Sequence, residues 1–371
     1  MKCMCHRETL LVAFQTAATV VPSRTPKPIL KNVRIDMTTE GGLVTATDME
    51  VGIRIEVPTV EVEVPGSFIA PVGLFGSILR ESSDTKLAIE AGSQGTRVTG
   101  EHCEFKMPFQ NPDEFPAVAA FQETSYHEVS AGLLRELIRR TAFATDQENS
   151  RYALGGVLLE LQDERVIGVA TDGRRLAKME GPARVVEGHS NVNAMTIVPT
   201  RAMTLLEKAL VNPEADVQIA ARPNDILVRG GPATIFARLV EGRFPRWRDV
   251  LPERPEATRV EINVGPLYSA LRQAAIFTDS ESRGIDFMFG NGILLLKASV
   301  ANSGDSRVEL PISYTGQPVT LALDNRYVGD FLRVLDPQQN IAIDFVDSES
   351  AALFTTTDGY GYVIMPMARE G

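Results

Sequence analysis

The residues of this sequence that could do acid–base chemistry lie where turns between strands are expected. Three Thr-Asp pairs, Thr47-Asp48, Thr171-Asp172 and Thr357-Asp358, each stand between two strand-like runs. Asp followed by Gly or by another turn residue tolerates positive φ at low cost, so such pairs are typical of hairpin ends. We therefore predict that the three pairs build turns and do not act as catalytic carboxylates.

Other signatures of catalysis are missing from the sequence. It contains no Gly-rich loop ending in Lys, no Gly-x-Ser-x-Gly turn, and only scattered histidines, at positions 6, 102, 127 and 189. Cys3, Cys5 and His6 could be metal ligands, but no second ligand pair follows at zinc spacing. We predict no catalytic, cofactor or metal site; a β-rich enzyme or carbohydrate-active protein with a hidden site is the alternative.

Length and composition bound the class of protein. The 371 residues suggest two or three domains, and the 44% hydrophobic content is enough for packed cores. No apolar run has transmembrane length, and the run Leu10–Phe14 lacks the flanks of a signal peptide. Three cysteines leave one unpaired, which fits a reducing cytoplasm. The net charge of −11 argues against a protein that fills a DNA groove, so nucleic acid would have to meet a local basic surface.

The stretch Val169–Ala177 lies between two strand-like runs near the middle of the chain. Its Asp172-Gly173 dipeptide predicts a tight turn between antiparallel strands. We expect this hairpin to project Arg174 and Arg175 from its tip into solvent, as a solvated pair.

Three segments share helical periodicity and a similar spelling, at residues 8–18, 131–143 and 265–277. Their aligned apolar residues, four positions apart on one helical face, are Leu10 and Phe14, Leu133 and Leu137, and Leu267 and Leu271. The aligned leucines put the three copies 123 and 134 residues apart. A fixed period of this size predicts a repeated domain and not a solenoid.

The rest of each copy has a common plan. A second helix is predicted near residues 71–79, 199–206 and 324–332, the last with Asp324 as its cap. Strand-like runs alternate apolar and charged residues, which is typical of antiparallel sheets with one buried face. Proline-marked linkers at 111–116 and 251–255 separate the copies. The sequence thus predicts an α+β fold of three similar domains, 1–124, 125–252 and 253–371, each with two helices packed on antiparallel sheets.

The order of three sequence words carries a resemblance to a known family. The words are Arg151–Gly156, Thr171–Leu176 and Tyr362–Met367, and they occur in addition to the three copies of one unit. The chain resembles the bacterial sliding clamp, the beta subunit of the replicative DNA polymerase, over essentially its whole length. The resemblance implies a DNA clamp fold and a head-to-tail, ring-shaped homodimer of six similar domains. Such a ring encircles duplex DNA, serves no catalytic role, and tethers the polymerase alpha subunit, the clamp loader and other partners.

The resemblance also implies a DNA-facing surface in the hole of the ring. Arg24 and Tyr152 match positions that the family uses to touch DNA. Basic residues of the helix segments are expected to face the hole and to attract phosphates weakly and without sequence preference; a solvated helix face is the alternative for each. These residues are Arg80, Arg135, Arg139, Arg140, Arg201 and Lys208, with Arg272, Arg326 and Arg333 on the same kind of segment.

A peptide-binding cleft between the second and third domains is the other implied site. Its apolar residues would accept the Leu and Phe anchors of partner peptides, and the alternative is that Met365–Met367 only close the core. Asp249, Arg174 and Ser282 depart from common family residues, which bears on the peptide preference. The cleft maps to Arg151, Leu154, Thr171, Gly173, Arg175, Leu176, Pro245, Val250, Tyr327, Val363, Ile364, Met365, Pro366 and Met367. The implied dimer contact joins Phe105 and Met107 to Ile276 and Phe277.

Overall fold

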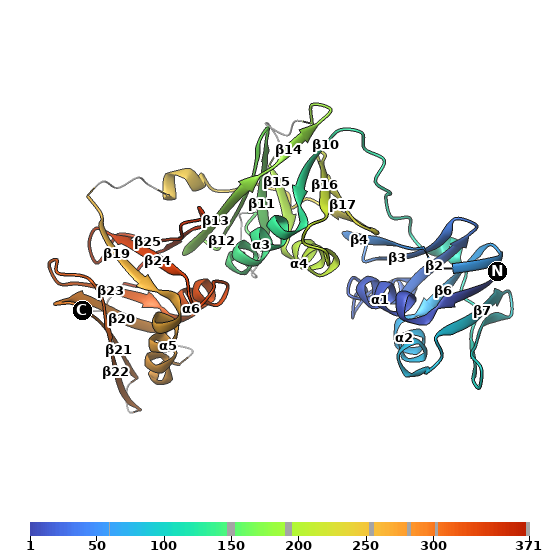
Figure 1. Cartoon of the computed structure of the whole chain (residues 1–371), viewed down its shortest axis with the longest axis horizontal. Helices are drawn as coiled ribbons and strands as arrows, with labels where there is room; N and C mark the ends of the chain where they lie inside the picture. The colour runs from blue at the N-terminus through green and yellow to red at the C-terminus, as the bar shows by residue number, and fades with distance from the viewer. Residues whose placement is uncertain are drawn as a thin grey trace. The chain divides into compact units, whose positions relative to one another are not determined.

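The computed structural model describes residues 1–58, 60–146, 153–189, 195–251, 256–279, 283–300 and 303–368 (Figure 1). The chain divides into two compact units. Unit 1 comprises Met1–Arg135, Leu161–Glu164 and Pro182–Val240, and unit 2 comprises Glu136–Glu160, Arg165–Gly181 and Glu241–Gly371. No helix in the described ranges has both the length and the apolar character that crossing a bilayer requires.

Unit 1 contains antiparallel sheets of five and nine strands. The smaller sheet has the order β5 (Val60–Val64), β1 (Lys2–His6), β7 (Lys86–Gly92), β8 (Gly95–Thr99) and β9 (Glu104–Met107). The larger has the order β14 (Arg184–Val186), β10 (Tyr126–Ser130), β16 (Asp216–Ala221), β17 (Asp225–Gly230), β18 (Ala233–Arg238), β4 (Val51–Val57), β3 (Gly41–Thr47), β2 (Asn32–Thr38) and β6 (Gly66–Pro71). Because β18 pairs with β4, strands of the first and second sequence copies form one continuous sheet.

The helices of unit 1 bury one apolar stripe each. They are α1 (Arg7–Ala18), α2 (Val72–Glu81), α4 (Thr200–Ala209) and the first turn of α3 (Ala131–Thr141), with η1 (Pro28–Lys31), η2 (Pro112–Glu114) and the short strand β15 (Thr196–Pro199) between them. In α1 and α2, which pack side by side against the sheet (Figure 1), Phe14 and Phe75 meet edge to face with ring centroids 5.1 Å apart. Residues spaced at three and four positions therefore bury the same face, as predicted.

Unit 2 repeats this layering. One sheet contains, in order, β11 (Gly156–Gln162), β12 (Arg165–Thr171), β13 (Arg175–Pro182), β26 (Gly361–Ile364), β25 (Ala352–Thr355), β24 (Asn340–Phe345) and β19 (Thr258–Asn263). The other has the order β22 (Gly304–Pro311), β21 (Ile293–Val300), β20 (Gly284–Gly290) and β23 (Val319–Asp324). The helical segments are the part of α3 from Glu136 onward, α5 (Val264–Ala274), α6 (Asn325–Arg333), η3 (Ala142–Ala144), η4 (Trp247–Val250) and η5 (Ala275–Phe277). The pairing of β13 with β26 joins the second and third copies.

The predicted alignment of the first helices was wrong by one residue in the central copy. Leu134 is fully buried, whereas Leu133 is only half-buried. The buried sets are Leu10, Ala13, Phe14 and Ala17 in α1, Leu134, Leu137, Ile138 and Thr141 in α3, and Leu267, Ala270, Leu271 and Ala274 in α5. The copies are therefore offset by 124 and 133 residues at this helix. The error arose because Leu133 and Leu134 are both apolar, and spacing alone could not choose between them.

The three Thr-Asp pairs lie in turns, as predicted, and two of the turns repeat in atomic detail. The Thr47 hydroxyl donates to the carbonyl of Val51 at 2.9 Å, and the Thr171 hydroxyl donates to that of Arg175 at 2.6 Å. In the third copy Thr356, and not Thr357, makes the matching bond, to Tyr360 at 3.5 Å. The positive φ falls on Met49 (83°), Gly173 (86°) and Gly359 (83°). The first two turns thus share one conformation, whereas in the third copy the positive φ falls three residues after the bonding threonine and not two.

Two of the histidines that look scattered in the sequence meet in unit 1. His127, on β10, is 1% exposed, and its Nδ1 lies 2.7 Å from Nδ1 of His189, which follows β14. The other ring nitrogens face the carbonyls of Gln162 at 3.1 Å and Ala221 at 3.3 Å. Burial lowers the pKa of both rings, and the charge of His189 lowers that of His127 further, while those carbonyls and the nearby Glu123 and Asp163 oppose the shift.

This pair makes the stability of the protein depend on pH. The unfolded chain binds protons near the usual histidine pKa of about 6.5, where the folded chain does not, so stability falls as pH drops through that value. We expect the free energy of unfolding, measured with denaturant, to fall between pH 7.5 and pH 5.5, and to fall less in His127→Gln. His6→Gln, which alters an exposed histidine on β1, serves as the control. An equal fall in His127→Gln and wild type would contradict this assignment.

Candidate functional site

A row of side chains crosses five strands on one face of the sheet in unit 2. Strand pairing places Leu176, Val363, Leu353, Asp344 and Arg259 directly opposite one another, from β13 to β19. Directly opposed residues point to the same face of a sheet. The other face is covered by α6, whose Phe331 ring stacks on Tyr362 with centroids 5.0 Å apart. The row therefore lies on the face opposite α6.

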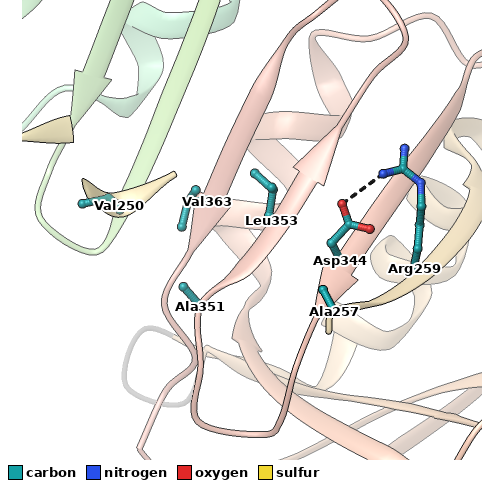
Figure 2. Close-up of a pocket in the computed structure, with 7 residues that line it drawn as sticks. All are labelled: Val250, Ala257, Arg259, Asp344, Ala351, Leu353 and Val363. Atoms are coloured by element: carbon teal, nitrogen blue, oxygen red, sulfur yellow. Dashed lines mark hydrogen bonds and ion pairs between the residues drawn. The ribbon is translucent and has the colours of Figure 1, made fainter. Parts of the chain in front are cut away.

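A groove runs along this row (Figure 2). Its cavity of about 180 Å³ is lined by Val250, Ala257, Arg259, Asp344, Ala351, Leu353 and Val363. Val250 belongs to η4 and lies beside Val363 in Figure 2, so the wall at that end comes from η4. Aliphatic side chains form one end of the groove, and the ion pair of Arg259 and Asp344 forms the other. Such a groove suits a peptide with apolar anchors and a polar continuation.

At the polar end of the groove one partner of the ion pair is mostly buried and the other is mostly exposed. Arg259 Nη1 lies 3.2 Å from a carboxylate oxygen of Asp344, with the arginine side chain mostly exposed and the aspartate mostly buried. Burial raises the pKa of Asp344, and the charge of Arg259 partly opposes this rise. The guanidinium of Arg259 keeps donors that face solvent.

The sequence-predicted cleft residues fall on two sides of the sheet. Val250 and Val363 line the groove, Leu176 extends its row, and Met365, 46% exposed, continues β26 beyond it. Leu154, Thr171 and Ile364 are buried, Pro245 and Pro366 half-buried, and Gly173 and Met367 exposed. Arg151 lies outside the described residues, as do Tyr152 and Ser282. Sequence reasoning missed Ala257, Arg259, Asp344, Ala351 and Leu353. Strand register brings Leu353, Asp344 and Arg259 into one row with Val363, and Ala257 and Ala351 precede β19 and β25.

Arg175 is not projected into solvent, which corrects the expectation for the hairpin. Its side chain is 7% exposed and turns to the face opposite the groove. There it pairs with Asp172 at 3.0 Å and with Asp330 of α6 at 2.7 Å, and its guanidinium stacks 4.4 Å from the ring of Tyr327. Arg175 and Tyr327 thus hold α6 to β13. Arg174 is exposed at the tip, as predicted.

The basic residues expected to face DNA differ sharply in accessibility. Arg140 is buried: it pairs with Glu136 and with Asp358, the latter at 2.7 Å, and stacks on the ring of Tyr360. The structure therefore gives Arg140 a packing role in place of a solvent-facing one. Arg135 is half-buried. Of the others, Arg80 pairs with Glu81, Arg139 with Glu136, and Arg201 with Asp48, while Arg24 and Lys208 are exposed.

Comparison with known proteins identifies the family. Three family models match in succession: "DNA polymerase III beta subunit, N-terminal domain" at residues 1–119, the central domain at 128–246 and the C-terminal domain at 248–368. The chain belongs to the family of DNA polymerase III beta subunits, the sliding clamps. Its function is thus that of a DNA sliding clamp, and its fold class, three clamp domains with helices on antiparallel sheets, is confirmed.

Individual sliding clamps resemble this chain along its full length. The "Beta sliding clamp" of Pseudomonas putida is 30% identical over 367 residues, covering 98% of this chain and 98% of the relative. That of Escherichia coli K12 is 26% identical over 370 residues, covering 99% of this chain and all of the relative. The crystal structure of the DNA polymerase III subunit beta from Pseudomonas aeruginosa has a TM-score of 0.92 at 28% identity, with both chains covered completely.

Proposed function

We propose that this sliding clamp acts as a head-to-tail homodimer that encircles duplex DNA and tethers replication proteins by a peptide groove, without catalysis of its own. The observation that carries the proposal is the groove at Val250 and Val363, an apolar slot on a clamp fold. The three copies, with boundaries at 1–124, 125–252 and 253–371, would contribute six domains to a ring. The partners would be the polymerase alpha subunit, the clamp loader and other proteins with the same peptide motif, in the cytoplasm at the nucleoid.

Two unpaired strand edges support dimer formation. In the described part of the chain, β9 ends the five-stranded sheet of unit 1 and β22 ends the four-stranded sheet of unit 2. Ile276, in η5 next to β22, is 73% exposed, and Phe277 packs over Gly304 at the start of β22. Phe105 on β9 is half-buried, whereas Met107 is already buried in its own unit. Natural proteins rarely leave such edges uncovered, so we propose that β9 of one copy meets the η5 end of another.

Dimer formation through Ile276 predicts a defined change in mass. Light scattering should give twice 40.5 kDa for the wild-type chain at micromolar concentration. Ile276→Asp should give the monomer mass, because a charge would be desolvated in the contact. Val211→Asp, which changes an equally exposed apolar residue (77%) in unit 1, should leave the dimer intact. A monomeric wild type, or a dimeric Ile276→Asp, would exclude this contact.

The DNA-facing surface would be a weakly basic one. Arg24 and Lys208 are exposed in unit 1, and Lys208 shares a small cavity with Arg201 and the end of α1. Arg80 and Arg139 keep exposed guanidinium groups beside their glutamate partners. Such neutralised cations give a loose attraction to phosphates, which favours sliding over fixed contact. Arg135 and Tyr152 stay proposals for the same surface.

The contribution of Arg24 can be read from salt dependence. For binding to linear duplex DNA, the logarithm of the association constant falls linearly with the logarithm of salt concentration, in proportion to the phosphates contacted. Arg24→Ala should reduce the slope by about one, and Arg238→Ala, which removes an exposed arginine of β18, should not. Equal slopes for wild type and Arg24→Ala would remove Arg24 from the DNA-facing set.

The peptide groove is tested by direct binding. A synthetic peptide with a Gln followed by Leu and Phe anchors should bind the wild-type chain with micromolar affinity, measured by calorimetry. Met365→Ala should weaken binding about tenfold, because a flexible apolar side chain is lost at the rim of the groove. Met4→Ala, which truncates an exposed methionine in unit 1, is the control. No detectable heat with the wild type would refute the groove as the binding site.

A further inference from the structure

The segment η4 forms a wall of the groove but has little stability of its own. It is one 3₁₀ turn of four residues, and the bond that closes its last residue, Leu251 N–H to the Arg248 carbonyl, is 3.4 Å long. Short 3₁₀ turns make too few hydrogen bonds to hold their shape alone. The position of Val250 beside Val363 must therefore be fixed by contacts from outside the turn.

Those contacts converge on one carboxylate of β11. Glu160 accepts a hydrogen bond from the indole Nε1 of Trp247 at 2.8 Å and two from the guanidinium of Arg248 at 3.0 and 2.5 Å. The Arg248 guanidinium also stacks over the Trp247 ring, 4.2 Å from its centroid. Trp247 is 7% exposed, so its bond to Glu160 is shielded from water. The Arg248 side chain is 58% exposed, so its ion pair is partly screened by water, and the bond from the buried indole is the better shielded of the two contacts.

The chain on either side of η4 also contacts other residues of unit 2. Gly242, with φ of 131°, leads into it over the buried Ala153, where an added Cβ would come within 3.1 Å of the Ala153 Cβ. At the other end, Leu251 packs over Gly361 of β26. These apolar contacts limit how far the segment can swing. Neither of these contacts involves Trp247 or Arg248, the two residues that Glu160 binds.

We propose that Glu160 is a positioning residue for peptide recognition: by holding Trp247 and Arg248 it keeps Val250 in place as the wall of the groove. This inference rests on the proposed peptide-binding function. Glu160 itself does not line the groove, so it acts through η4. If the wall of the groove is ordered before binding, peptide binding does not have to order it. The entropy cost of binding is then smaller, and the affinity is higher without any added contact.

The single tryptophan of the chain makes this testable, because Trp247 emission reports on η4 alone. Glu160→Ala should shift the emission maximum to longer wavelength and weaken the synthetic Gln-Leu-Phe-type peptide about tenfold by calorimetry. Glu160→Gln keeps an acceptor for the indole and loses the charge, so it should be intermediate in both measurements. Glu180→Ala, which removes a glutamate of the same sheet that pairs with Lys178 at 3.0 Å, should change neither.

The outcomes separate this inference from the proposed function. An emission shift in Glu160→Ala with peptide affinity within twofold of wild type would overturn the positioning role and leave the groove standing. A loss of affinity without any emission shift would also overturn it, because the effect would not pass through η4. If the wild-type chain fails to bind the peptide, both proposals fail. Should Glu160→Ala not fold, Glu160→Gln and Arg248→Gln give the same comparison.

Discussion

Backbone hydrogen bonding between strands of successive copies is the interaction on which the rest of the structure depends. β18 of the second copy pairs with β4 of the first over five residues, and β13 of the second pairs with β26 of the third over four. Each joint turns two open strand edges into the interior of one sheet. The compact units therefore do not follow the sequence copies: residues of the central copy belong partly to unit 1 and partly to unit 2. The second joint places Leu176 next to Val363, one of the residues that line the groove.

The use of arginine explains how an acidic chain can serve DNA. Arg140 and Arg175 are buried in ion pairs that hold helices to strands, so their charges are paired with acids inside unit 2. Arg80 and Arg139 are exposed but lie beside glutamates. Each of these four charges lies beside an acid, which weakens its own field at the surface. A protein that must stay on DNA by topology and still move along it gains nothing from a stronger field.

Features that depend on residues close together in the sequence were predicted correctly, and contacts between strands that are distant in the sequence were missed. Helix and strand positions, the Asp324 cap and the turns at the Thr-Asp pairs follow from spacing and from residue chemistry within a few positions. The choice between Leu133 and Leu134 failed because both fit the helical period. Arg175, the histidine pair and the ion pair of Arg259 and Asp344 depend on which strands become neighbours. Strand order across 80 to 200 residues is set by the packing of whole sheets, and no short-range pattern encodes it.

The two joints between copies are built alike, but the chain that follows each Phe-Pro pair meets the sheet differently at the two joints. The hairpin turns of the first and second copies are 124 residues apart in the sequence. Gly52 of the first copy therefore corresponds to Leu176 of the second. The chain after Pro116 packs directly on that glycine: the methyls of Val118 lie 2.7 and 3.0 Å from where a Gly52 Cβ would be, and Arg54 donates to the Val118 carbonyl. Trp247 follows Pro245 as Val118 follows Pro116, but its indole donates a hydrogen bond to Glu160. At the second joint Leu176 takes the place of that glycine, and the chain beyond Trp247 lies beside the sheet with Val250 and Val363 lining the groove.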